Sequence, residues 1–568
     1  SKQLRGGARQ TVKSENGHTV IQMTTRYLCL ALLVTAVIPA SSSVVGEQVF
    51  GVADSVVCSP EHSAEHHNLF INTQNSWFHN PALHFDDYGS TYGNLGIYAD
   101  KRREDEAFVM QEGNALYNIG IRAASYRRLY GKDNVAERLR RSMTVVWGEA
   151  SYQNGRRDNV EWNTSSDWST IYPYVLADTI RSDRNTERYA FKGGCATRFG
   201  QWTIGEELTF RAEHEWSVND PRMRGIVTDL NARIGISRSI MNHILALGTT
   251  LKLYKQTNSV EFFREEGTVP EYQMSGLGNW YERFSGTNNK AYYKATGCGT
   301  DFAIRPAARK GGVIFTASYE YTPYRRILSS LNALPISRLY VTRWQARVGW
   351  KSMMKGSSMS ETGMALWLGM NGEKRRGDEI IGGESIANEY AVRGYLTMYG
   401  NRFTDIHLGT MANIALGSNH ILALIIQGGH QRHSSSYAYP HSELNFGRNH
   451  FGATLQWQAK GRRWLVVADV EGRYDKNVSG SFTTTTDNSY TSPLKDNVAA
   501  AKKRMTERCV AHALASYTQL SFGLHAEWMP KFMNGMGLFA ETRTEYRKNN
   551  VGGSNNGYAL HASMGITF

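Results

Sequence analysis

Proline and charged residues are both scarce in this chain of 568 residues. Only 12 residues are proline, against a usual ~5%, and charged residues make up 20%, against a usual ~25%. Glycine (54 residues), tyrosine (30 residues) and aromatic residues in general (11%) are plentiful instead. This composition excludes a collagen, a disordered chain and a helical repeat, and it is typical of a strand-rich chain with tight turns.

Long apolar runs are also missing. Mean hydropathy is −0.45, and the apolar run at residues 27–38 is too short for a bilayer-spanning helix of ~20 residues. A bundle of membrane helices is therefore excluded. The run follows a short basic start at Met23 and precedes small residues up to Gly46, so residues 23–46 are predicted to be a signal peptide. We expect residues 1–22 to be an upstream segment without a structural role.

Cysteine is rare, and charge of one sign is nowhere concentrated. Apart from Cys29 in the apolar run, the cysteines are Cys58, Cys195, Cys298 and Cys509, far apart and without a CxxC pair. Their spacing leaves disulfide pairing open. The net charge of +13 is spread along the chain without a basic block, so no nucleic-acid partner is predicted.

After residue 90 the chain alternates between apolar and polar residues with a period of two. In residues 557–568 every even-numbered residue is apolar, and every odd-numbered residue is glycine, alanine, histidine, serine or threonine. Residues 226–236, 451–458 and 464–473 behave alike. Period two indicates strands with one apolar face, which suits either a soluble sandwich or a membrane barrel.

Three further features favour the membrane barrel. Trp464, Trp528 and Tyr558 lie near segment ends, as in the aromatic girdles of outer-membrane barrels. The polar faces mix both charge signs, as a wet lumen does. The chain also ends on Phe568, which resembles the assembly signal of bacterial outer-membrane barrels. We therefore expect outer-membrane lipid and the barrel assembly machinery as partners.

Segment spacing predicts an all-β, transmembrane antiparallel barrel at residues 91–568. The prediction is about 18 strands, with 14–20 allowed, and the expected strands 388–414 and 505–529 are each long enough to be two. Short connections alternate with long ones such as 153–185, 375–387, 435–447 and 477–504, as periplasmic turns alternate with extracellular loops. An even strand count places both termini in the periplasm. Residues 47–90 make no good spanning strand and are predicted to be an N-terminal periplasmic segment or plug.

Two groups of residues are candidates for chemistry near the N-terminus and in a long loop. On a helix, Cys58, His62 and His66 of the pattern C-x3-H-x3-HH share a face and can ligate a soft metal or haem iron, although a flexible polar segment is the commoner case. Loop carboxylates Asp167, Asp178 and Asp183 can serve hydrolysis, although solvated acids are the commoner case. No G-x-S-x-G, H-E-x-x-H or phosphate-loop motif is present, so neither an enzyme nor a cofactor is predicted.

A third group comprises charged residues on the polar strand faces, which are expected to point into the lumen. They form either a selectivity filter or a network of cross-strand ion pairs, and the interleaved signs favour the network. These residues are Arg233, Asp469, Glu471, Arg473, Glu541, Arg543, Glu545 and Arg547.

Residues 111–129 and 146–179 carry a resemblance to a known family. The QEG start, the W-G-x-A-S-Y strand, the N-G-x-R turn and the YPYV-x-ADT loop resemble an uncharacterised outer-membrane β-barrel family of the Bacteroidota. The resemblance implies the fold and the location, and it implies genes near TonB-dependent receptors. Asn80-Pro-Ala82 is in addition similar to the N-P-A element of hydrophobic-substrate transporters and secretion-system barrels.

The functional expectation is an outer-membrane channel or an accessory component for solute uptake. The partner implied by the resemblance is a TonB-dependent receptor or a periplasmic or surface lipoprotein. A barrel subunit of a secretion or surface-attachment complex is the alternative. A barrel enzyme that hydrolyses lipid or peptide is the second alternative.

Overall fold

The computed structural model describes ten stretches of the chain within the compact unit Val57–Phe568. They are residues 59–129, 143–261, 272–280, 290–307, 310–328, 333–353, 362–386, 389–485, 493–533 and 535–568. The predicted upstream segment, the predicted signal peptide and Cys58 lie outside them. None of the helices in the described stretches has the length and apolarity needed to cross a membrane.

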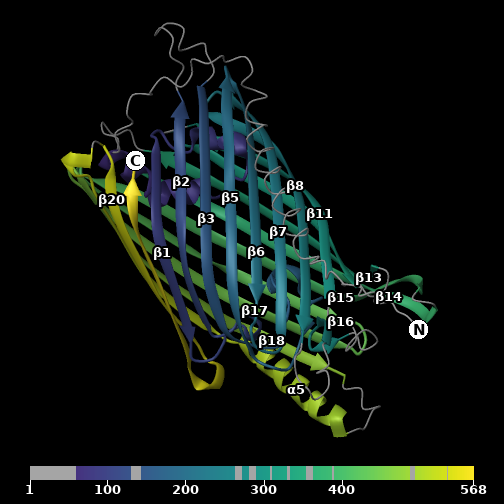
Figure 1. Cartoon of the computed structure of the whole chain (residues 1–568). Helices are drawn as coiled ribbons and strands as arrows, with labels where there is room; N and C mark the ends of the chain where they lie inside the picture. The colour runs from purple at the N-terminus through teal and green to yellow at the C-terminus, as the bar shows by residue number, and fades with distance from the viewer. Residues whose placement is uncertain are drawn as a thin grey trace, which may run out of the picture. The chain divides into compact units, whose positions relative to one another are not determined.

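Eighteen antiparallel strands in the described residues form one closed barrel, which confirms the predicted fold and strand count (Figure 1). Each strand pairs with the next along the chain, and β1 closes the ring against β21. The barrel strands are β1 (Tyr92–Glu104), β2 (Ala115–Leu129), β3 (Met143–Val160), β5 (Ser182–Phe199), β6 (Trp202–Trp216), β7 (Arg222–Ile240), β8 (His243–Glu261), β11 (Lys290–Pro306), β12 (Gly312–Leu328), β13 (Leu334–Met353), β14 (Gly363–Ile386), β15 (Glu389–Leu416), β16 (His420–Tyr437), β17 (Ser442–Lys460), β18 (Trp464–Thr484), β19 (Tyr517–Trp528), β20 (Gly537–Asn549) and β21 (Asn555–Thr567).

The closing seam involves the last residue of the chain. The backbone N–H of Gly93 donates to the carbonyl oxygen of Phe568 at 2.9 Å, and the N–H of Phe568 returns the bond to Gly93 at 2.9 Å. A side chain at Gly93 would overlap the Phe568 ring. Phe568 therefore lies on the seam between the first and last strands.

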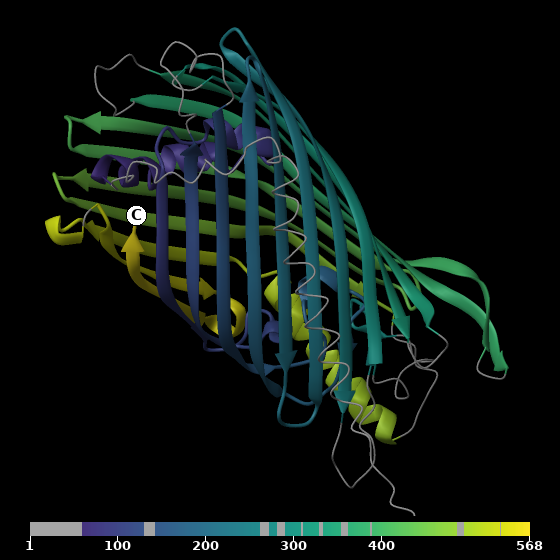
Figure 2. The ribbon, with the colours of Figure 1, turned by 45° about the horizontal axis from the view of Figure 1, so that its top comes forward.

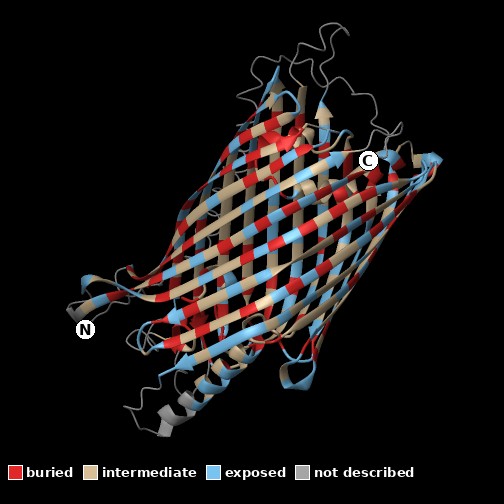
Figure 3. Ribbon diagram, turned by 180° about the vertical axis from the view of Figure 1, so that it is seen from behind, coloured by how far each residue is buried: buried red, intermediate tan, exposed pale blue. Residues whose placement is uncertain are grey.

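The outer surface of the barrel is apolar, and burial alternates along each strand as Figure 3 shows. Leucine, isoleucine, valine and phenylalanine side chains are exposed around the wall, which is stable only in lipid. Exposed tryptophans gather within three residues of one set of strand ends, as an aromatic girdle does. They are Trp202, Trp350, Trp457, Trp464 and Trp528.

The two ends of the barrel differ in their connections. At the end where β1 begins and β21 ends, here called the turn side, residues 200–201, 241–242, 417–419 and 461–463 make tight turns. The opposite end, here called the loop side, carries residues 161–181 and the helix α5 (Pro493–Ala513). Figure 1 shows α5 at the far end of the barrel from the C-terminus.

Several expected boundaries were wrong. The expected strand 505–529 is helical up to Ala513, and β19 begins only at Tyr517. The expected loops 375–387 and 435–447 are mostly strand, because β14, β16 and β17 continue past the lipid on the loop side. Beyond the bilayer both faces of a strand meet water, so alternation disappears while pairing continues. The expected strand 388–414 is a single strand, β15.

Residues 59–91, here called the plug, lie inside the barrel near the turn side (Figure 2). The plug contains α2 (Pro60–His66), α3 (Leu69–Asn75) and the 3-10 helix η1 (Pro81–Asp86). Side chains of Ser59, Asn68 and Asn80 accept backbone N–H bonds at the three helix starts. Such caps allow short helices to form where their length alone would not.

The loop side is covered by a second set of segments, here called the cap: residues 105–114, 161–181, 272–280 and 493–516. They contain η2 (Met110–Glu112), α4 (Trp168–Ile171), α5, and a small sheet of β4 (Leu176–Ala177), β9 (Tyr272–Gly276) and β10 (Asn279–Trp280). Buried cap side chains such as Ile171 and Leu176 pack against wall residues such as Leu328 in one apolar cluster. Two further 3-10 helices, η4 (Lys531–Met533) and η5 (Val551–Gly553), lie in the last connections.

Candidate functional site: a chamber in the lumen

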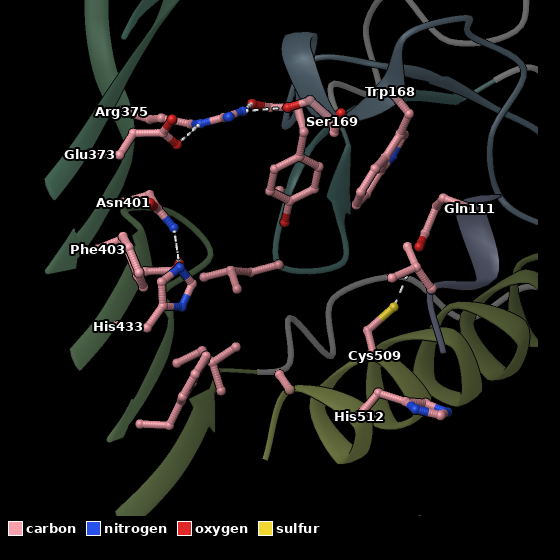
Figure 4. Close-up of a pocket in the computed structure, with 18 of the residues that line it drawn as sticks. Gln111, Trp168, Ser169, Glu373, Arg375, Asn401, Phe403, His433, Cys509 and His512 are labelled. Carbon is pink, nitrogen blue, oxygen red and sulfur yellow. Dashed lines mark hydrogen bonds and ion pairs between the residues drawn. The ribbon is translucent and has the colours of Figure 1, made fainter. Parts of the chain in front are cut away.

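A cavity of about 870 Å³ lies in the lumen between the plug and the cap. His79 of the plug lines one part of it, and Trp168, Tyr172 and Cys509 of the cap line another. Figure 4 shows α5 and the loop of Trp168 facing strands of the wall across this space. Its volume is in the range that holds a small-molecule ligand, ~300–1,000 Å³.

The chamber lining combines aromatic rings with an excess of positive charge. Five arginines face two glutamates, Glu320 and Glu373, among the charged lining residues. Such a lining offers apolar contact together with guanidinium donors, although Arg233, Arg343, Arg375 and Arg508 each also pair with a carboxylate. The arginines are Arg233, Arg343, Arg375, Arg448 and Arg508, and the aromatic residues are Phe108, Trp162, Trp168, Tyr172, Trp344, Phe403, Phe446, Phe482 and Tyr517.

Arg375 joins the wall to the cap. Its Nε donates to Glu373 at 2.7 Å, and one terminal nitrogen donates to the carbonyl oxygens of Ser169 at 2.9 Å and Tyr172 at 2.8 Å (Figure 4). Glu373 also accepts from Arg343 at 2.6 Å. The guanidinium thus satisfies loop carbonyls that would otherwise be left unpaired.

The polar groups of the lining hold one another rather than forming a nucleophile–base pair. The Asn401 amide nitrogen lies 2.7 Å from both the His433 ring and the Ser435 hydroxyl. Cys509 accepts a long bond of 3.6 Å from Gln111, and burial raises the pKa of its thiol. A thiol with a raised pKa is a poor nucleophile near neutral pH.

The plug is seated in a notch made by wall glycines. Asn80 is fully buried, and its amide donates to Asp301 of β11 at 3.1 Å. A Cβ at Gly235 or Gly248 would overlap the Asn80 amide, and a Cβ at Gly205 would overlap the adjoining Pro81–Ala82 backbone. The N-P-A element singled out in the sequence therefore lies in close contact with the wall.

Charged contacts hold the plug next to this notch. Arg305 of β11 pairs with Asp87 at 3.1 Å and donates to the Leu83 carbonyl oxygen at 2.6 Å. Arg198 pairs with Asp86. Burial raises the pKa of Asp87, but the charges and hydrogen bonds of His84 and Arg305 outweigh it and hold that pKa below its usual value. Asp87 is therefore a carboxylate in the docked plug.

The model of the family of unknown function DUF6850 matches residues 81–568. The chain belongs to this family. The match confirms the expected membership of an uncharacterised family, and the barrel confirms the expected fold. No curated protein matches the chain.

Solved barrels are similar to this family member only at a distance. CdiB from Acinetobacter baumannii is 8% identical, with a TM-score of 0.30, over 83% of this chain and 60% of that chain. BauA, the ferric preacinetobactin receptor of A. baumannii, is 9% identical, with a TM-score of 0.34. The match covers 84% of this chain and 79% of BauA. FpvA of P. aeruginosa is 9% identical, with a TM-score of 0.36. The match covers 83% of this chain and 71% of FpvA.

The sequence-predicted metal candidates are only partly described. Cys58 lies outside the described residues, while His62 and His66 both lie on α2. The His66 ring stacks on Tyr88 with 4.0 Å between centroids, and its Nε2 lies 3.1 Å from the Ser90 carbonyl oxygen. Burial lowers the pKa of His66 to about 4. His66 is thus committed to plug packing in this structure.

A different group, missed in the sequence, brings three possible ligands together. His67 of the plug meets His525 and Glu527 of β19, with one ligand atom of each within 4.8 Å of the others. The doublet His66-His67 and the strand pattern His525-Ala-Glu527 were both visible in the sequence. Nothing local shows that residues 67 and 525 meet, because the contact depends on where the plug docks.

The predicted lumen charges mostly pair with each other or with wall neighbours. Arg543 meets Asp469 at 2.8 Å and Glu471 at 2.7 Å. Arg473 pairs with Asp475, Arg547 with Glu545, Arg233 with Glu207, and Glu541 with His525. Of these predicted charges, only Arg233 lines the chamber.

The three loop carboxylates do not converge. Asp167 pairs with Arg211 of β6 at 2.6 Å, and Asp183 pairs with Arg156 at 2.9 Å. Asp178 is buried and accepts a bond from the Ile180 N–H at 2.6 Å. Burial raises the pKa of Asp167, but the bond and charge of Arg211 outweigh it and lower that pKa. Asp167 therefore joins the cap to the wall, whereas Asp183 pairs two neighbouring wall strands.

In the described part of the chain, Cys195, Cys298 and Cys509 are free thiols. The disulfide question left open by the sequence is therefore answered for these three. Cys195 and Cys298 lie on barrel strands, whereas Cys509 alone of them lines the chamber.

Proposed function

We propose that this chain is an outer-membrane barrel that takes up a small anionic solute with an aromatic or otherwise apolar part. The observation that carries the proposal is the chamber, because it is lined by five arginines, two glutamates and many aromatic rings. Arginine binds carboxylate or phosphate with two donors at once, and aromatic rings cover the remainder of such a ligand.

An outer-membrane location is supported by the apolar exterior, the girdle of exposed tryptophans and the closed sheet. We place the turn side in the periplasm, because outer-membrane barrels carry short turns there and longer loops outside. Both the start of β1 and the end of β21 are then periplasmic.

Passage through the barrel requires a segment to move, because the plug and the cap lie on opposite sides of the chamber. The proposal therefore includes a partner that displaces the plug or the cap. A TonB-dependent receptor or a periplasmic or surface lipoprotein, the candidates implied by the family resemblance, can supply that displacement. Co-purification from membranes with such a protein would identify it.

A role without catalysis fits the chamber chemistry better than hydrolysis. Among the described lining residues, Ser435 and His433 each meet the Asn401 amide instead of one another. Burial raises the pKa of the Cys509 thiol, which disfavours the reactive thiolate. We therefore propose solute binding and passage rather than bond cleavage.

The test compares three ligands of one shape on the purified full chain. Benzoate, benzyl alcohol and benzylamine share a ring and differ in charge, and isothermal titration measures the affinity of each. We expect benzoate to bind at least tenfold more tightly than the neutral alcohol, and the amine to bind least. Arg375→Ala should reduce this preference, whereas Arg402→Ala, on an exposed position of β15, should not. Equal affinity for all three ligands would refute the proposal.

A further inference from the structure

The junction between the plug and the wall contains a compact group of nitrogen and oxygen ligands. His67 Nε2 lies 3.2 Å from Glu527 Oε1, and His525 Nε2 lies 2.9 Å from the same oxygen. The two imidazole rings have centroids 4.0 Å apart. His67 follows the last turn of α2, while His525 and Glu527 share the inner face of β19, so two remote segments supply the group.

The hydrogen bonding of Glu527 is uneven. Besides the two histidines, the Tyr92 hydroxyl donates to Oε1 at 2.9 Å, so three groups crowd one carboxylate oxygen. The other oxygen, Oε2, is shielded from solvent, and the Ser63 hydroxyl also bonds to this carboxylate. Glu527 itself is only 2% exposed. A carboxylate this deeply buried is costly unless a positive charge lies beside it, and a bound cation would supply that charge.

A second carboxylate orients one of the rings. Glu541 Oε2 lies 3.4 Å from His525 Nδ1. The other ring nitrogen of His525, Nε2, faces Glu527. Metal-binding histidines usually direct their other ring nitrogen to a carboxylate or a carbonyl, which fixes the ring and its tautomer. His525 therefore presents Nε2 to the centre of the group.

We infer that His67, His525 and Glu527 bind a divalent transition-metal ion, and that this ion latches the plug to β19. Two imidazoles and one carboxylate are a ligand set that Zn²⁺ accepts, with a fourth position left for water or the Tyr92 oxygen. Imidazole ligands disfavour Ca²⁺ and Mg²⁺, which prefer oxygen. The His67 side chain is 23% exposed, so an ion can reach the group from the turn side. This site does not depend on what the chamber binds.

The first experiment measures metal binding to the full chain after removal of metals with EDTA. We expect one Zn²⁺ per chain by equilibrium dialysis, and an absorption band in the visible region when Co²⁺ replaces it. His67→Ala, His525→Ala and Glu527→Gln should each weaken binding at least tenfold. His561→Ala is the matched control, because His561 is also a strand histidine paired with a carboxylate, that of Asp100, at 2.6 Å.

Each outcome of the binding experiment decides the site. No saturable binding by the wild-type chain would show that the group is only a hydrogen-bonded cluster and would overturn the inference. Binding lost in the double variant His62→Ala, His66→Ala but kept in His525→Ala would place the ion on α2 and would overturn it as well. Heat-modifiable mobility on gels checks that each variant still forms the barrel.

The second experiment tests the latch. Protease cleavage within the plug is followed with Zn²⁺ and with EDTA, and we expect at least tenfold slower cleavage with Zn²⁺. In Glu527→Gln the two rates should be equal, because the glutamine keeps the shape but loses the charge. Unchanged cleavage in a wild-type chain that binds Zn²⁺ would overturn the latch while leaving the chamber proposal untouched.

Discussion

The plug and the cap are held by the same device, a wall arginine that donates to backbone carbonyl oxygens. At the plug, Arg128 donates to the Phe85 and Tyr88 carbonyls at 2.7 and 2.8 Å. At the cap, Arg326 donates to Met274 at 3.2 Å, and Arg448 donates to the carbonyls at the end of α5. A cation at a helix C-terminus also interacts favourably with the helix dipole.

The two ends differ in where the counter-charge stands. At the cap two wall arginines each have an acid on the wall, with Glu373 beside Arg375 and Glu215 beside Arg184. Arg211 pairs with Asp167 of the cap, but it also pairs with Glu213 of its own strand. At the plug, the acids that pair with the wall arginines belong to the plug itself. Within the described residues, the ion pairs of Arg198 and Arg305 are all with Asp86 and Asp87.

This difference indicates which end is the more sensitive to anions. When the cap lifts, the wall arginines that held it remain neutralised by glutamates of the wall. When the plug leaves, two wall cations lose their partners, and an anion that replaces the plug carboxylates reduces that cost. The plug therefore occupies a place on the wall that suits an anion, in agreement with an anionic solute in the chamber.

The largest effect is expected from Arg305→Ala. The substitution leaves Asp87 buried without its arginine, and breaking a buried ion pair from one side costs about 3–5 kcal/mol. We expect rapid protease cleavage within the plug and an increase in conductance across planar bilayers. Arg473→Ala, which removes a pair within one wall strand, is the control and should change neither. Cleavage as slow as in the wild type would show that the charge on the plug is not what holds it.

A smaller effect is expected from Gly235→Ala. The new methyl group would overlap the Asn80 amide, and overpacking of this kind costs about 1–3 kcal/mol. The expected result is an intermediate rate of plug cleavage in a barrel of unchanged thermal stability. In the control, Gly472→Ala on β18, the nearest heavy atom is an ordinary 3.5 Å away in Leu520. Equal cleavage in both variants would contradict a seat at the N-P-A element.

Arg375→Ala should act on the cap alone and more weakly. Two bonds to loop carbonyls are lost, at about 0.5–1.5 kcal/mol each, while Glu373 keeps Arg343. We expect several-fold faster alkylation of Cys509, read by mass spectrometry of its peptide, with no change in plug cleavage. Faster plug cleavage in this variant would mean that the two ends are coupled and are not held independently.

The barrel was predictable because its signal is repeated. Period-two alternation, tight turns and the terminal Phe568 occur along one chain, and together they predicted about 18 strands, with 14–20 allowed. The helical start of the expected strand 505–529 was missed, because residues 505–513 lie in the cap, outside the lipid that imposes alternation.

The site was less predictable, because it is built from long-range contacts. Asn80 was singled out in the sequence, but its partners Gly235, Gly248 and Asp301 lie more than a hundred residues away. No local pattern encodes that register. The arginines of the chamber look in the sequence like any other polar residue of an alternating strand, and only the docking of the plug and cap distinguishes them.

The smallest effect concerns pH and Asp87. Its pKa in the docked plug lies below the ordinary value of ~3.9, so the carboxylate stabilises docking at every pH above that value. The stabilisation is lost as the pH falls through the lowered pKa, because protonation removes the charge that Arg305 needs. Protease protection of the plug should therefore be constant from pH 8 to about pH 5 and decline below about pH 4. Asp87→Asn should show weaker protection at every pH and a smaller decline in acid. If protease protection declined in acid as strongly in Asp87→Asn as in the wild type, a group other than Asp87 would be responsible for the acid response of the plug.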